Sequence, residues 1–241
     1  MTSGADPTAD GLAATRLELQ RIATHVLARA RAAHGGRFGL RVTPSGIGTP
    51  VFGPDETVLR LTSTALVREH QGPDGAVAAV LPLAGRTLAE VAAFAGIGLD
   101  APFAPGGDAP AVGDPHASLV LHPAATEVLL GWFATGAQVL DGVLDDLSGP
   151  TVAQLWPEHF DVGLACATGS GGVTLGASPG DGAVPEPYVY VAPWESGRPG
   201  DPGYWNAAFG AVATRADLAG RDPVAGAVAF VRRGLDLLGP A

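Results

Sequence analysis

FGLRVTPSGIGTPVFGPDETVLRLTSTALVREHQGPDGAVAAVLPL, residues 38–83, is the stretch that decides the fold class. Short runs of β-favouring residues alternate in it with clusters of Gly, Pro, Ser and Asp, which are typical of turns. This alternation predicts an antiparallel meander. The four runs are 38–43, 47–52, 57–67 and 76–83.

Helices are predicted on both sides of this meander. Apolar residues recur at three- and four-residue spacing from Ala9 to Ala33, which predicts a helix that packs one face inward. After the meander, Thr87-Leu-Ala-Glu90 has the spacing of a capping box, in which each side chain bonds the other residue's backbone N–H. We therefore expect a second helix that reaches about Ala95.

The second part of the chain repeats this order of elements. Residues 98–116 are rich in Gly, Pro, Ala and Asp and predict a connector without regular structure. A helix is predicted over 123–147, with Pro at its first position, and a last one from Asp222-Pro223 to Leu238. The strands predicted between these two helices are 159–167, 172–177, 187–191 and 209–215.

These elements predict an α+β protein with antiparallel sheets packed against helices. The expected organisation is an N-terminal half (1–97), a connector (98–116) and a C-terminal half (117–241). Both halves follow the order helix, strands, helix, as a structural duplication would produce. The alternative is a single sheet with helices on one face.

Composition excludes several classes of function. All 14 basic residues are Arg, which excludes functions that need a lysine amine, such as Schiff-base formation or a phosphate-loop lysine. A net charge of −10 opposes binding to nucleic acid. The N-terminal residues 1–6 lack a signal-peptide pattern and no apolar run approaches the ~20 residues of a membrane span, so we expect a cytoplasmic protein. The single cysteine, Cys166, has no partner for an internal disulfide.

Candidate site residues gather between positions 156 and 206, which hold all three tyrosines and three of the four tryptophans. On a strand, His159 and Asp161 would share a face with the small residues Gly163 and Ala165. We therefore predict His159 as a general base oriented by Asp161. The residues predicted to bind a ligand are Trp156, Glu158, Asp181, Glu186, Tyr188, Tyr190, Trp194, Trp205 and Asn206.

Two chemical motifs were tested in this region. Residues 176–180 match the G-x-S-x-G pattern of a hydrolase, but no helix follows and no histidine comes after Ser178, so this interpretation fails. Acidic residues and His159 supply metal-ligand types, yet their spacing matches no metal motif. The residues therefore identify no metal or cofactor.

Two functional hypotheses stay open. Tyr188, Tyr190 and Trp194 alternate onto one side of a strand, where they either stack on a sugar or planar ligand or pack as a structural ladder. In the first hypothesis the chain binds a small molecule in its C-terminal half, with or without catalysis. In the second it is a non-catalytic structural or interaction protein whose acidic and aromatic residues form a buried polar network. Its acidic surface is compatible with a homodimer.

Four motifs together resemble a known group of proteins. They are LWPEHFD (155–161), GASPGD (176–181), PEPYVYVAPW (185–194) and WNAAFG (205–210). The set resembles an uncharacterised family of actinobacterial proteins of unknown function. The resemblance implies a soluble protein from a GC-rich bacterium, and it implies no reaction, cofactor or catalytic residue.

Overall fold

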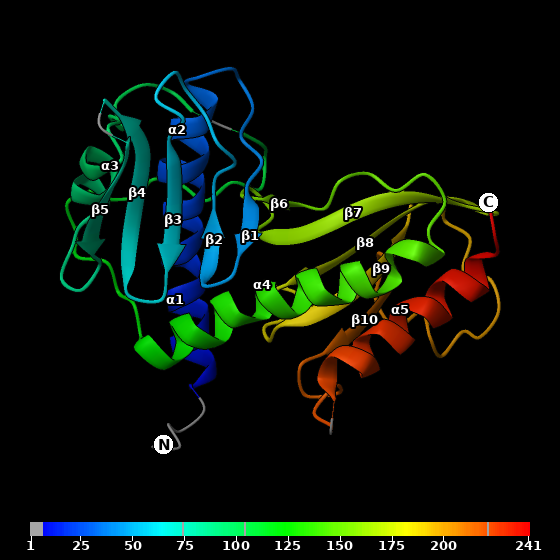
Figure 1. The fold of residues 1–241 in the computed structure, drawn as a ribbon. Coiled ribbons are helices and arrows are strands. Elements are labelled where there is room, and N and C mark those ends of the chain that lie inside the picture. The colour runs from blue at the N-terminus through cyan, green and yellow to red at the C-terminus, as the bar shows by residue number, and fades with distance from the viewer. Residues whose placement is uncertain (1–6, 74, 104, 221) are drawn as a thin grey trace. The chain divides into compact units, whose positions relative to one another are not determined.

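The computed structural model describes residues 7–73, 75–103, 105–220 and 222–241. The chain forms two compact units: unit 1 runs to Gly131 and includes Leu155–Phe160, and unit 2 comprises Trp132–Gln154 and Asp161–Ala241. The structure contains two five-stranded antiparallel sheets and their helices, which confirms the predicted α+β class (Figure 1).

A long helical segment opens unit 1. It consists of α1 (Ala9–Ile22), the π-helix η1 (Ala23–Ala28) and α2 (Arg29–Ala32). The predicted helix is thus confirmed, and its middle is a π-helix that the sequence did not predict. Thr8 caps its start, because its side chain accepts from the backbone N–H of Gly11. All six residues of η1 are buried.

The sheet of unit 1 is the predicted meander, with five strands in chain order. The predicted run 57–67 is divided, because the chain turns at residues 63 and 64, where the Thr62 hydroxyl accepts from the N–H of Ala65. The strands are β1 (Arg41–Thr43), β2 (Gly46–Gly48), β3 (Val58–Thr62), β4 (Ala65–Gly72) and β5 (Gly75–Pro82).

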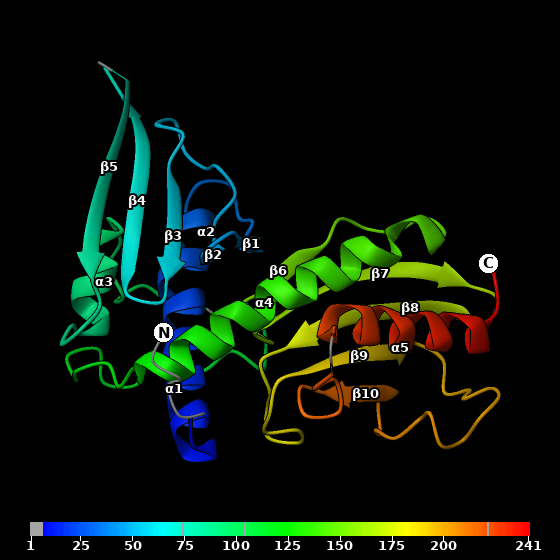
Figure 2. The ribbon, with the colours of Figure 1, turned by 60° about the horizontal axis from the view of Figure 1, so that its bottom comes forward.

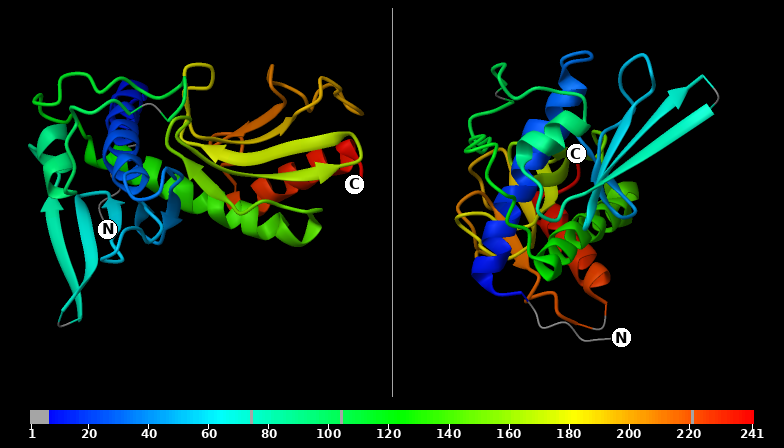
Figure 3. Two further views of the ribbon diagram at one scale, coloured as in Figure 1. Left: turned by 90° about the horizontal axis from the view of Figure 1, so that it is seen from above. Right: turned by 90° about the vertical axis from the view of Figure 1, so that its left-hand side faces the viewer.

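One face of this sheet is apolar and buried, as shown by Leu59 and Leu61 of β3, which are fully buried. The hairpin of β4 and β5 extends beyond the other strands (Figure 3). Helix α3 (Leu88–Phe94) follows it, and the predicted capping box of Thr87 and Glu90 is present.

The predicted connector belongs to unit 1. Residues 98–116 lie inside that unit, so the predicted boundary there is wrong and the chain passes into unit 2 within helix α4 (Pro123–Val143). This helix begins at the predicted proline but ends before Leu147, and a short 3-10 turn, η2 (Leu144–Asp146), follows it.

The second sheet has the strand order β10-β9-β8-β7-β6. Four strands correspond to predicted ones, with ends shifted by one or two residues, while β6 was missed because it is only three residues long. The final helix α5 (Pro223–Leu238) has the predicted cap, Asp222. The strands are β6 (Gln154–Trp156), β7 (Asp161–Thr168), β8 (Gly171–Ser178), β9 (Tyr188–Pro193) and β10 (Ala211–Thr214).

Within unit 2 the two faces of the sheet differ. Helix α5 and the later part of α4 cover one face (Figure 2). Glycines allow this close approach: a Cβ at Gly136 of α4 would stand 2.5 Å from the Ala177 side chain, and one at Gly234 of α5 would stand 3.0 Å from Val191. The opposite face carries the side chains of Tyr188 and Tyr190, because successive residues of a strand point to opposite faces.

Among the residues that the structure describes, no helix is both long and apolar enough to cross a membrane. Residues 1–6, whose sequence predicts no signal peptide, lie outside the described part of the chain. So does Asp74 of the predicted turn at 71–75.

Candidate functional site

Two tyrosine–aspartate pairs lie on the face of the unit 2 sheet opposite to helices α4 and α5, in a cluster that Val184 and Ala207 help to cover. The Tyr190 hydroxyl donates to Asp161 Oδ2 at 2.5 Å, and the Tyr188 hydroxyl donates to Asp181 Oδ2 at 2.5 Å. Strand β9 places the two rings side by side, two residues apart, with centroids separated by 6.2 Å. Both tyrosines are buried. The structure thus brings together four of the predicted site residues.

Glycines beneath the rings explain why Tyr190 lies flat on the sheet. In the register of β7, β8 and β9, Gly163 stands opposite Gly176, and Gly176 opposite Tyr190. A Cβ at Gly176 would approach the Tyr190 ring to 2.5 Å, and one at Gly163 would approach its hydroxyl to 3.0 Å. Tyr190 therefore fills the space above the small residue Gly163.

The electrostatics of these pairs suit a structural network. Burial, followed by the neighbouring Asp161, raises the pKa of Tyr190 well above its usual value, and burial and the bond to Asp181 raise the pKa of Tyr188. Both phenols therefore stay protonated and act as donors at neutral pH. Asp181 also accepts from the backbone N–H groups of Ala183 and Val184, both at 2.7 Å, which ties the loop after β8 to β9.

The aromatic row ends in an exposed ring. Trp194 is 66% exposed, yet its indole Nε1 donates to the Thr174 hydroxyl at 3.0 Å. Its ring lies over Gly172, where a Cβ would come within 2.2 Å of the ring. Phe209, 38% exposed, packs 6.2 Å from Tyr190. This face therefore presents to solvent an aromatic side chain that is hydrogen-bonded in place.

The predicted pairing of His159 with Asp161 is wrong. Strand β7 begins only at Asp161, because Phe160 adopts a left-handed backbone conformation (φ 54°) that interrupts any alternation from His159. His159 lies in unit 1, where its Nδ1 is 3.2 Å from Asp108 Oδ2. Both of those side chains are exposed.

Glu158 lies inside unit 1 and is 7% exposed. Within the described part of the chain its buried Oε2 has no hydrogen-bond partner, and its side chain packs on Gly106 of the segment before α4. Two residues of the N-terminal helix hold this turn, since Gln20 donates to the Glu158 carbonyl at 2.8 Å and Thr24 donates to the Pro157 carbonyl at 3.0 Å. Glu158 therefore belongs to the interior of unit 1 and not to the aromatic face of unit 2.

The remaining predicted residues secure loops. In unit 2, Trp205 donates to the Pro199 carbonyl at 2.8 Å, and Asn206 exchanges two hydrogen bonds with the backbone of Val212. Glu186 accepts from the N–H of Ala216 at 3.3 Å. In unit 1, Trp156 packs edge-on to Phe38. Trp205 thus fastens the loop that contains Pro199.

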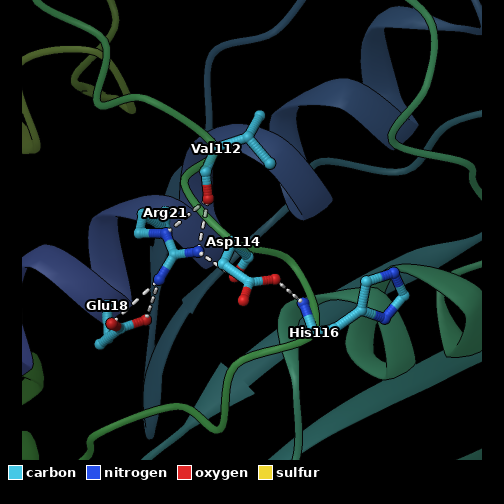
Figure 4. A network of polar contacts seen from close by, with 5 residues as sticks. All are labelled: Glu18, Arg21, Val112, Asp114 and His116. Carbon is cyan, nitrogen blue, oxygen red and sulfur yellow. Dashed lines mark hydrogen bonds and ion pairs between the residues drawn. The ribbon is translucent and has the colours of Figure 1, made fainter.

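A row of basic residues on the N-terminal helix was not predicted as a site. Arg21, His25 and Arg29 are spaced four apart, so they share one helix face, and each donates to carbonyls of residues 98–114. Figure 4 shows Arg21 between Glu18 and the Val112 carbonyl. The four-residue spacing of basic residues was the sequence signal for this row. The hydrogen bonds from these basic residues explain why the predicted connector packs within unit 1.

His25 is the buried member of this row. Its Nε2 lies 2.6 Å from the Pro110 carbonyl, so the ring must be protonated at Nε2, while Nδ1 is buried without a hydrogen-bond partner among the residues that the structure describes. Burial lowers the pKa of His25, and the charges of Arg29 and Arg21 act in the same direction. The ring is therefore neutral at pH 7, and it lies in the π-helix η1, a conformation frequent at functional sites.

Each unit also contains a cavity that none of the predicted site residues lines. The cavity of unit 2, about 620 Å³, lies between η2, β7 and α5 and is lined by Cys166 and three aspartates. Burial raises the pKa of Cys166, so its thiol is a poor nucleophile at neutral pH. The cavity of unit 1, about 400 Å³, lies beside β4 and β5.

Comparisons with known proteins add no family. No protein-family model, no curated protein and no solved structure matched the chain. The resemblance to the actinobacterial family therefore stays a prediction. Within the described residues, no group of three or more His, Cys, Asp and Glu side chains is arranged to hold a metal ion.

Proposed function

We propose that this protein binds a small molecule that presents a flat ring face, such as a sugar, at the exposed Trp194 end of the unit 2 sheet. In this proposal Trp194 contacts the ligand. The buried tyrosine–aspartate pairs give the sheet its rigidity and do not take part in chemistry. The protein would thus have both features that the two hypotheses treated as alternatives, a ligand-binding surface and a buried polar network.

One observation carries the proposal, namely that Trp194 is exposed and yet held by a hydrogen bond to Thr174. Leaving a large aromatic side chain in water forgoes the free energy of its burial, about 1.5–3 kcal/mol for a large apolar side chain. Its hydrogen bond to Thr174 and its contact with Gly172 hold the ring in place before any ligand arrives. An ordered side chain costs less entropy on binding than a mobile one. Tryptophan is accordingly enriched at binding hot spots.

Polar groups beside Trp194 suit a hydroxylated ligand. Glu195 follows it directly, and the Glu195 side chain lies against Gly171, next to the Gly172 on which the indole rests. A carboxylate can accept hydrogen bonds from ligand hydroxyl groups, while the indole packs against the apolar face of a sugar ring. This combination favours a sugar over a purely apolar ligand.

The indole N–H resonances of the four tryptophans test this proposal directly. We expect one member of a panel of mono- and disaccharides and nucleosides to shift the Trp194 resonance saturably. The Trp132 resonance should not move, because Trp132 is buried and bonded to the Tyr188 carbonyl. Trp194→Ala should abolish binding without unfolding the protein.

Trp156→Phe is the matched control, because Trp156 is also exposed but lies in unit 1. It should leave the affinity unchanged. A panel without any saturable shift at Trp194, or binding that survives Trp194→Ala, would reject the sugar-binding proposal and leave the interaction-protein alternative.

We extend the proposal to location and origin. A single, buried cysteine and no disulfide suit a reducing compartment, which supports action in the cytoplasm. The use of arginine for all 14 basic residues supports a GC-rich, actinobacterial source.

A further inference from the structure

Strand β5 is an exposed and uncharged edge of the unit 1 sheet. It is the last strand in the order β1-β2-β3-β4-β5, and seven of its eight residues are exposed. Val77 and Val80, on opposite faces of the strand, are 47% and 60% exposed. Its sequence, GAVAAVLP, contains no charged residue, although natural proteins usually protect such edges with charges, prolines or bulges.

The ladder to β4 determines which backbone groups of β5 are free. The N–H of Leu83 donates to the Thr64 carbonyl, and the register from Ala65↔Pro82 to Gly72↔Gly75 continues without a bulge. Hydrogen-bonded pairs alternate along an antiparallel ladder, so the odd-numbered residues of β5 bond to β4. The N–H and C=O groups of Ala76, Ala78 and Val80 therefore point away from the sheet.

The side chains of β5 are complementary to those of a second, antiparallel β5. With Ala78 on a two-fold axis, Ala76 stands opposite Val80 of the other copy, and Val77 opposite Ala79. Each pair matches a small residue with a larger one, and all three outward-facing residues find hydrogen-bond partners. We propose that the protein forms a homodimer in which two copies pair their β5 strands antiparallel about Ala78.

Charge favours a second copy at this edge over other parts of the surface. The whole chain has a net charge of −10, which opposes self-association. Residues 58–82 hold two positive residues, Arg60 and Arg68, and two negative ones, Glu69 and Asp74, so the net charge of this block is zero. Arg60 is in addition ion-paired with Glu69. Two copies can approach here without net repulsion.

A single pair of strands buries less than the roughly 1,200–2,000 Å² of a standard stable interface. The dimer should therefore be weak and depend on concentration. Sedimentation velocity on the full chain from about 5 to about 500 μM covers the range of such an equilibrium. Wild type should move from monomer to dimer across this range.

Ala78→Lys should keep the protein monomeric at all of these concentrations, because it places two ammonium groups together at the two-fold axis. Val152→Lys is the matched control, since it adds the same charge at a residue that is 89% exposed in unit 2. It should dimerise as wild type does. Circular dichroism establishes that both variants are folded.

Cysteine cross-linking tests the register. Residues directly opposite in a hydrogen-bonded pair have Cα atoms about 5.5 Å apart, within disulfide range, so Ala78→Cys should form a covalent dimer under mild oxidation. Ala76→Cys should not, because its two copies would lie about 14 Å apart along the strands. Native Cys166 is buried and contributes no background.

The proposal is overturned if wild type remains monomeric throughout, or if Ala78→Lys dimerises like Val152→Lys. Equal cross-linking of Ala76→Cys and Ala78→Cys would overturn the pairing about Ala78.

Discussion

The ring of Tyr190 rests directly on Gly176, the residue that pairs with it across strands β9 and β8. An ideal Cβ on Gly176 would lie 2.5 Å from the Tyr190 ring carbon Cζ and 2.5 Å from the Val162 carbonyl oxygen. No side chain fits between ring and backbone. This contact lets the Tyr190 hydroxyl reach Asp161.

Gly176→Ala should therefore destabilise the protein strongly. Because the new methyl group meets backbone as well as the ring, we expect a loss of about 2–3 kcal/mol or more in the free energy of unfolding, measured with urea. Gly182→Ala is the control, since no described atom beyond its own residue and its two chain neighbours lies within 4 Å of its ideal Cβ. It should change stability by about 0.5 kcal/mol or less. Equal stabilities of the two variants would contradict this packing.

Tyr190→Phe should cost more stability than Tyr204→Phe. The Tyr190 hydroxyl donates to a carboxylate, whereas the Tyr204 hydroxyl donates to the neutral Phe230 carbonyl at 2.9 Å. Hydrogen bonds to charged groups contribute about 1.5–3 kcal/mol and neutral ones about 1 kcal/mol.

A double-mutant cycle of Tyr190→Phe with Asp161→Asn isolates the pair. It should give a coupling energy of about 1 kcal/mol or more. Additive effects in the urea-unfolding measurements would show that the short hydrogen bond contributes nothing.

Native protein should form little tyrosinate near pH 10. Burial raises the pKa of all three tyrosines, and the neighbouring carboxylates raise those of Tyr188 and Tyr190 further. Above the usual pKa of about 10 the folded state holds more protons than the unfolded state, so stability is complete below pH 10 and is lost as the pH rises. Tyrosinate absorbance should thus appear together with loss of near-ultraviolet circular dichroism. Independent titration of one phenol in folded protein at pH 10 would contradict the burial of that ring.

His25 should make stability decrease on the acid side. Its pKa is lowered in the folded state, so the unfolded state binds the proton more readily, and stability present above about pH 6.5 falls as the pH is lowered. The slope from one such group is at most about 1.4 kcal/mol per pH unit. Urea unfolding of wild type between pH 7.5 and pH 5, which spans this ordinary pKa of about 6.5, measures it.

His25→Gln is the informative variant, because the amide nitrogen of Gln can donate to Pro110 as Nε2 does but does not titrate. It should have a shallower pH dependence than wild type over this range. An unchanged slope would assign the acid sensitivity to other groups.

The sequence alone determined the elements of this protein to a large extent. Capping and apolar spacing depend only on residues close together in the sequence. They therefore predicted the strands bounded by glycines and the helices that begin after Thr8, Thr87 and Asp222. The alternation of side chains along a strand was enough to predict that Tyr188 and Tyr190 lie on the same side. The absence of lysine from the sequence also excluded functions that need a lysine amine, and the net charge of −10 argued against nucleic-acid binding.

Only the tertiary structure decided the partners of these residues. Alternation placed His159 beside Asp161, but the left-handed conformation of Phe160 ends that pattern, and contacts distant in sequence gave each residue another partner: Asp108 and Tyr190. Alternation along the strand likewise did not show that the Tyr190 ring, from a strand two positions away in the sheet, fills the space above Gly163. Local patterns depend on neighbours within a few residues, whereas burial, hydrogen-bond partners and pKa shifts depend on which strands the fold brings together.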